Sequence, residues 1–117
     1  DDVVLAPTWS ARLLAGVEND PAHARAARAV LAREFGAERV HGLTKVVPAF
    51  SEDFGFFLDE TPGAMFFLGV ASAQLGHTGM PHASDFVADE EAIFVGARAM
   101  AAVLLDALRT AATVEAR

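Results

Sequence analysis

An uninterrupted apolar run, Ala-Met-Phe-Phe-Leu-Gly-Val at residues 64–70, narrows the choice of fold more than any other stretch of this 117-residue chain. The run does not alternate between apolar and polar residues, as the strand of a half-exposed sheet does. Strands with this pattern are typically covered on both faces, as in parallel sheets that carry helices on either side. The run therefore predicts an α/β protein with a partial parallel-type sheet flanked by helices.

Two helices are predicted before the run. Asp20 is a suitable N-cap, Pro21 suits the first helical position, and Gly36 favours an end, so one helix is expected between residues 20 and 36. A second, short helix is expected from Ser51, as its cap, through about Glu60.

A long helix is predicted after the run, beginning near Asp89, because apolar residues recur there at helical spacing. This apolar stripe consists of Ile93, Ala97, Met100, Ala101, Leu104 and Leu108. Residues 2–6 and 39–47 read as strands. Together with the short helix, the second of these strands and the apolar run would form a right-handed crossover unit.

The charge of the chain is concentrated in its middle. The formal net charge is −7, from 16 acids against 9 Lys and Arg. Lys45 is the single Lys or Arg between residues 41 and 95, so this segment carries the excess of acids. Its carboxylates fit either helix starts, where they favour the N-terminal dipole, or the surroundings of a cation.

Composition also excludes several classes of protein. An acidic chain is a poor partner for nucleic acid, because phosphate binding needs basic residues. No apolar run approaches the roughly 20 residues of a membrane span, and we expect a cytoplasmic protein. The absence of cysteine excludes disulfides, thiolate metal ligands and a cysteine nucleophile.

Two histidines, His77 and His82, follow the apolar run in the same predicted loop. In open α/β sheets, ligands bind beyond the carboxyl ends of the strands, so a histidine in this loop is a candidate ligand. His82 and Asp85 could supply two metal ligands, but a zinc site needs at least three from protein. A small independent site of His77, His82 and Asp85 is one alternative.

Three segments resemble the zinc amidohydrolases of the aminoacylase type, which include hippurate hydrolases and N-acyl-amino-acid amidohydrolases. Residues 51–69, SEDFGFFLDETPGAMFFLG, are similar to the family stretch GSEDFAYFLEEVPGAFFFLG. Residues 82–93, HASDFVADEEAI, are similar to HSPxFxxDExAL, and residues 18–21, ENDP, resemble VNDP.

The resemblance implies that His82 is one ligand of a two-metal site holding zinc or manganese. It also implies that the remaining ligands and the general base lie in an N-terminal half outside this sequence. Residues 1–16 would then end a lid domain, and residues 17–117 would form the C-terminal part of a di-zinc exopeptidase-like catalytic domain.

On this interpretation the parent enzyme hydrolyses small amides such as N-acyl amino acids, whereas this chain alone holds no stable metal and is inactive. Glu52 and Asp53 would either lie near the substrate or cap a helix. The expected partners are the small amide substrate and either the missing half or a second copy of the chain. The alternative function is an α/β interaction module without catalysis.

Overall fold

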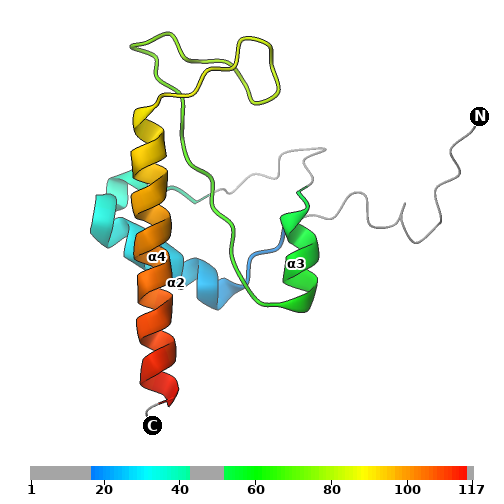
Figure 1. Ribbon diagram of the computed structural model, residues 1–117, viewed down its shortest axis with the longest axis vertical. Helices are drawn as coiled ribbons and strands as arrows, with labels where there is room; N and C mark the ends of the chain where they lie inside the picture. Colours follow the sequence, from blue (N-terminus) through cyan, green and yellow to red (C-terminus); the bar gives the residue numbers. More distant parts are fainter. Residues whose placement is uncertain (1–16, 43–51, 116–117) are drawn as a thin grey trace, which may run out of the picture.

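The computed structural model describes residues 17–42 and 52–115 (Figure 1). Over these residues the elements are α2 (Pro21–Phe35), the 3₁₀ turn η1 (Ala37–Arg39), α3 (Phe54–Glu60) and α4 (Glu91–Glu115). Helix α4 is the longest, and α2 crosses it (Figure 1). An extended segment leads from α3 along α4 to a loop that returns to the start of α4 (Figure 1).

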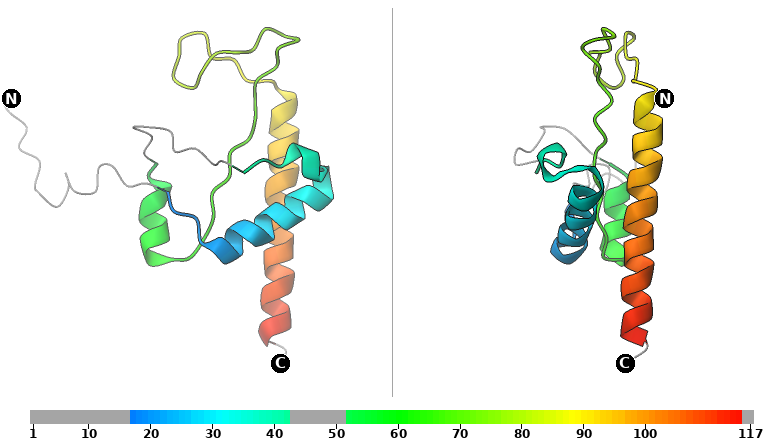
Figure 2. Two further views of the ribbon diagram at one scale, coloured as in Figure 1. Left: turned by 180° about the vertical axis from the view of Figure 1, so that it is seen from behind. Right: turned by 90° about the vertical axis from the view of Figure 1, so that its left-hand side faces the viewer.

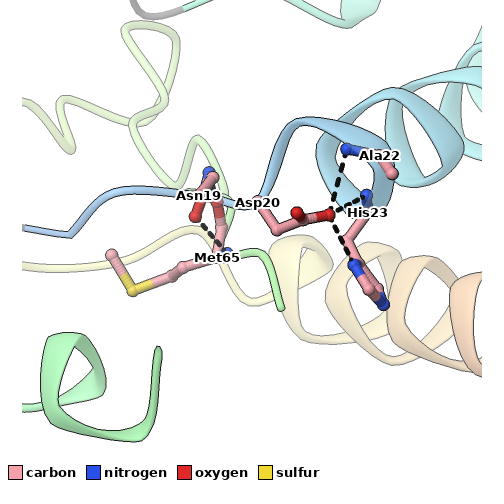
Figure 3. Close-up of polar contacts among 5 residues, drawn as sticks. All are labelled: Asn19, Asp20, Ala22, His23 and Met65. Carbon is pink, nitrogen blue, oxygen red and sulfur yellow. Dashed lines mark hydrogen bonds and ion pairs between the residues drawn. The ribbon is translucent and has the colours of Figure 1, made fainter. Parts of the chain in front are cut away.

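The predicted limits of α2 are confirmed. Asp20 Oδ1 accepts hydrogen bonds from the backbone N–H groups of Ala22 (3.0 Å) and His23 (2.9 Å), and it lies 2.7 Å from His23 Nδ1 (Figure 3). These contacts, led by the His23 backbone N–H, hold the pKa of Asp20 below its usual value. Gly36 ends the helix with a φ of 96°, which a residue with a Cβ rarely adopts.

Asn19, beside the cap, fixes the extended segment to the start of α2. Its amide nitrogen donates to the Met65 carbonyl, and its amide oxygen accepts from the Met65 N–H, both at 2.8 Å (Figure 3). The Asp20 N–H donates to the Gly63 carbonyl at 2.8 Å. Each residue of the Asn-Asp-Pro sequence therefore has its own role. Asn19 holds a segment that is distant in the sequence, Asp20 caps α2, and Pro21 is its first residue.

The predicted parallel-type sheet flanked by helices is wrong for the described residues, which are mainly helical and form no strand. Residues 64–70 run in an extended path, but a side-chain amide takes the place that a neighbouring strand would have at Met65. Of the expected neighbours, residues 2–6 and 43–47 lie outside the described residues. Residues 37–39 form η1, so the start of the predicted strand at 39 is also wrong.

Helix α3 begins later than predicted, at Phe54. Asp53 precedes it, but its side chain makes no capping hydrogen bond, and Ser51 lies outside the described residues. The predicted cap of α4 is confirmed, because Asp89 Oδ1 accepts a hydrogen bond from the Glu91 N–H at 3.1 Å. None of the helices in the described ranges is long and apolar enough to cross a membrane.

The apolar stripe predicted for α4 does not face α2. Instead, the buried residues of α4 are the small Ala92 and Ala99, which are 8% and 4% exposed and lie on the opposite side of the helix. Hydrophobicity alone does not reveal which of two apolar faces of a helix its neighbours will cover.

Polar contacts also join α2 to α4. Arg33 Nη2 of α2 lies 2.9 Å from Asp106 Oδ1, and Arg98 Nη2 of α4 lies 2.7 Å from Glu34 Oε1. The Arg98 guanidinium also lies 5.2 Å from the centre of the Phe35 ring, a cation–π distance. Two ion pairs and one cation–π contact thus join α4 to α2.

A larger residue at the buried face should destabilise the protein. We expect Ala99→Leu to lower the free energy of unfolding by about 1–3 kcal/mol, since Ala99 is buried and a larger side chain there forces its neighbours apart. Ala107→Leu, at an exposed position of the same helix, should change it by less than about 0.5 kcal/mol. Urea unfolding at one protein concentration measures both, and a larger loss for Ala107→Leu would show that the face is misassigned.

Candidate functional site

Backbone hydrogen bonds hold the loop between the extended segment and α4 at two places. At its base, the Asp89 N–H donates to the Val70 carbonyl at 2.8 Å, which joins the end of the extended segment to the start of α4. Further along, Ser72 and His77 form an isolated antiparallel bridge with backbone hydrogen bonds of 2.8 and 2.9 Å. Local backbone pairing therefore shapes a loop that has little apolar burial.

His82 lies in a tight turn within this loop. The Ala83 N–H donates to the Met80 carbonyl at 3.0 Å, and Pro81 and His82 are the central residues. Proline at the first central position and a positive φ at the second are typical of a type II turn. His82 has a φ of 69° and is the only non-glycine residue with a positive φ among the residues described.

The conformation of His82 is costly. A side chain in the left-handed region costs roughly 1–2 kcal/mol, and glycine usually occupies this position of a type II turn. The imidazole is exposed, and no hydrogen bond or ion pair joins it to another described residue. Backbone outliers of this kind cluster at functional sites, which makes His82 a candidate for a functional role.

Gly79 closes the His82 turn at its base. A Cβ at Gly79 would lie 2.7 Å from the Asp85 carbonyl oxygen and 2.9 Å from the Phe86 Cα. Only glycine permits this approach of two backbones, which brings the ends of the segment 79–86 together. The sequence reasoning missed Gly79, although the Gly-x-Pro-His order around Pro81 could have indicated a tight turn.

His77 occupies a different setting. Its side chain is half-buried, and Nδ1 is buried with no described group bonded to it. Its backbone forms the bridge to Ser72, which fixes its position in the loop. The structure does not bring His77, His82 and Asp85 together, and no group of three or more potential metal ligands occurs in the described ranges.

The other predicted site residues lie elsewhere. Glu52 is half-buried and Asp53 is exposed just before α3. Helix α3 and the His82 loop lie at opposite ends of the extended segment (Figure 1). The backbone carbonyls of Glu52 and Asp53 accept hydrogen bonds from Gly55 and Phe56, both at 3.0 Å, so these residues begin α3. Their proximity to substrate stays a prediction.

The described residues therefore supply one candidate metal ligand, His82, and no group of three or more potential ligands occurs among them. A catalytic zinc ion takes three protein ligands and an open position, whereas this loop offers the single exposed imidazole of His82. The arrangement can present one candidate ligand in a fixed place.

Comparison with known proteins gives two similarities. The sequence model of "Peptidase family M20/M25/M40" matches residues 7–106, a range that includes all three resembling segments. The chain is 38% identical over 53 residues to "IAA-amino acid hydrolase ILR1-like 6" of Arabidopsis thaliana. That alignment covers 45% of this chain and 11% of the plant protein. No solved structure matches.

Proposed function

The chain belongs to peptidase family M20/M25/M40, and from this membership we propose that it supplies the C-terminal segment of the catalytic domain of a metal-dependent amidohydrolase. The proposed substrate is a small amide of the N-acyl-amino-acid type. Support for this class comes from the name of the plant relative, a hydrolase of an amino-acid conjugate. The matched part is a small share of that relative, so the activity is proposed for the complete protein.

The observation that carries the proposal is the strained, exposed turn at His82. A neutral imidazole has one nitrogen that can bind a metal ion and a second that can donate to a carboxylate or carbonyl. The positive φ of His82 and the closed base at Gly79 fix where the ring leaves the backbone. His82 is thus proposed as one metal ligand, with zinc or manganese as the expected metals.

The remaining parts of the proposed site come from outside the described residues. When bound, the metals would supply activation of a water molecule for attack on the amide carbonyl. The contribution of this chain is to place one ligand at the end of the extended segment and to hold it there. Alone, the chain should therefore be inactive.

Joining the chain to the rest of a catalytic domain of this family tests the proposal. The joined polypeptide should hydrolyse a small N-acyl amino acid in the presence of zinc or manganese, and the 117-residue chain alone should not. Release of the free amino acid measures both. Metal-dependent turnover by the chain alone would contradict the proposed division of the site, and an inactive but folded joined polypeptide would contradict the function.

A glycine at position 82 should stabilise the chain, because glycine tolerates the positive φ of this position. His82→Gly relieves the positive φ, so the isolated chain should gain about 1 kcal/mol in free energy of unfolding. His82→Ala keeps the unfavourable φ and should gain nothing. Urea unfolding of the chain compares the two variants; equal stability would show that the turn at His82 is not strained.

A further inference from the structure

The extended segment 64–70 is held by hydrogen bonds near both of its ends. Near its start, the Asn19 side chain pairs with both backbone groups of Met65 at 2.8 Å. At its end, the Val70 carbonyl accepts a hydrogen bond of 2.8 Å from the Asp89 N–H, at the base of the loop that leads into α4. The segment therefore connects the start of α2 to the start of α4, and the loop begins where the segment ends.

The middle of the segment packs on α4. A Cβ at Gly96 would lie 2.9 Å from Leu68 Cδ2, so the Leu68 side chain occupies the space that a side chain at position 96 would need. Glycine is less favourable than alanine inside a helix, and here it makes room for Leu68. The segment is therefore located along α4 as well as near its own ends.

These contacts close a frame with three sides, which are α2, α4 and the segment. The Arg33–Asp106 and Arg98–Glu34 ion pairs join α2 to α4, and Asn19 joins the segment to the start of α2. In the left-hand view of Figure 2, the segment passes the start of α2 and continues beside α4 to the loop. The frame fixes where the loop begins and ends, although little of the loop itself is buried.

Asn19 uses both polar atoms of its side chain on a single residue of the segment. Nδ2 donates to the Met65 carbonyl and Oδ1 accepts from the Met65 N–H, as a neighbouring antiparallel strand would. In an extended chain, the N–H and C=O groups of successive residues point to opposite edges. Asn19 could therefore pair with another residue of the segment only after a slip of two positions, which would move the segment by about 6.6 Å.

A change of this register would carry through to the loop. A slip of one residue turns the side chains to the opposite face, so Leu68 would leave Gly96. A slip of two residues would separate Val70 from Asp89 and shift the base of the loop. Because a displacement of about 1 Å at a catalytic site can cost about 100-fold in rate, His82 needs a segment that keeps one register.

We propose that Asn19 is a positioning residue for His82: by fixing the register of segment 64–70, it fixes where the His82 loop leaves the frame. The proposal rests on the proposed function, since it assigns to Asn19 an effect on metal binding by His82. Asn19 acts through the backbone of the segment and does not itself bind the metal.

Amide hydrogen exchange of the 117-residue chain tests the pairing. Asn19→Ala removes both hydrogen bonds, so the Met65 amide should exchange at least about tenfold faster. Asp20→Ala is the matched control, because it removes the neighbouring polar side chain and the cap of α2 but keeps Asn19. In this control the amides of Ala22 and His23 should exchange faster, whereas the Met65 amide should keep its protection.

Calorimetric titration of the joined polypeptide with zinc or manganese tests the positioning role. Asn19→Ala should weaken metal binding by about 10–100-fold, the range for residues that support a ligand without touching the metal. Asp20→Ala should lower the urea midpoint of unfolding by a similar amount and leave the metal affinity unchanged. A purely structural Asn19 would behave as Asp20 does in both measurements.

A second substitution covers the case in which the Asn19→Ala polypeptide does not fold by circular dichroism. Asn19→Asp keeps the shape of the side chain and the acceptor for the Met65 N–H, but it sets an oxygen against the Met65 carbonyl oxygen. It should weaken metal binding in the same direction. Gln74→Glu makes the same change from amide to carboxylate at an exposed position of the loop, and it should not weaken binding.

Two results would overturn the proposal: a Met65 amide that stays protected in Asn19→Ala, or an unchanged metal affinity in a folded Asn19 variant. His82→Ala, titrated beside them, separates this failure from that of the proposed function. If His82→Ala weakens metal binding and the Asn19 variants do not, the positioning role alone is wrong. If none of these variants weakens it, the assignment of His82 as a ligand is wrong as well.

Discussion

His82→Ala should reduce kcat/KM for hydrolysis of an N-acyl amino acid by several orders of magnitude in the polypeptide that joins this chain to the rest of a catalytic domain of this family. The reason is that the substitution removes a proposed ligand of the metal itself. Loss of a supporting residue outside the coordination shell typically costs 10–100-fold, so the loss for His82→Ala should exceed that range.

His77→Ala is the matched control for this variant. His77 is five positions away in the same loop, is half-buried and has its backbone in the bridge to Ser72. Its replacement should cost far less activity, because its side chain has no proposed role at the metal. Equal losses in the two variants, with the metal content unchanged, would show that His82 does not bind metal.

Gly79→Ala should lower activity in the same polypeptide by about 100-fold while leaving the helices intact. A Cβ at position 79 would lie 2.7 Å from the Asp85 carbonyl oxygen, so the two backbones must separate and the His82 turn must shift. A displacement of about 1 Å at a catalytic site can cost about 100-fold in rate. Steady-state kinetics and circular dichroism together measure the loss and the integrity of the fold.

Gly69→Ala is the control for the change of residue type. Gly69 precedes the loop, and a Cβ there would meet nothing within 4 Å. This variant should keep nearly full activity. If Gly79→Ala is as active as Gly69→Ala, the close approach at the base of the turn does not position His82.

Local signals in the sequence predicted local structure well. Asp20, Pro21 and Gly36 act within one or two turns of the helix that they delimit, so α2 could be predicted from neighbouring residues alone. The Asp89 cap of α4 was predictable for the same reason. These contacts need no information about distant parts of the chain.

The sequence pattern could not predict which face of α4 is buried or which residues pair with the apolar run 64–70, because both depend on tertiary contacts. Helix α4 has two apolar faces, and the buried residues Ala92 and Ala99 lie opposite the predicted stripe, on a side that the pattern alone did not identify. Likewise, the apolar run 64–70 is compatible with a central strand, but a strand needs neighbours, and Asn19 pairs with Met65 instead. The pattern gave the extended path and could not give its partners.

The candidate site was predictable in part. The resemblance directed attention to His82, and the structure adds that this residue has a positive φ in a turn closed by Gly79. Backbone dihedral angles depend on the whole loop, so a histidine in the left-handed region is not evident from composition or spacing. Glu52 and Asp53 resemble the family equally well, yet they begin α3, away from this loop.

The central claim is that this chain contributes His82, and not a complete metal site, to a hydrolase of the M20/M25/M40 family. Calorimetric titration with zinc or manganese tests it most directly, using the chain alone, the joined polypeptide and the joined polypeptide with His82→Ala. We predict specific binding to the joined polypeptide, none to the chain alone, and affinity reduced by orders of magnitude in the variant. Tight, stoichiometric binding by the chain alone, or unchanged affinity in the variant, would contradict the claim.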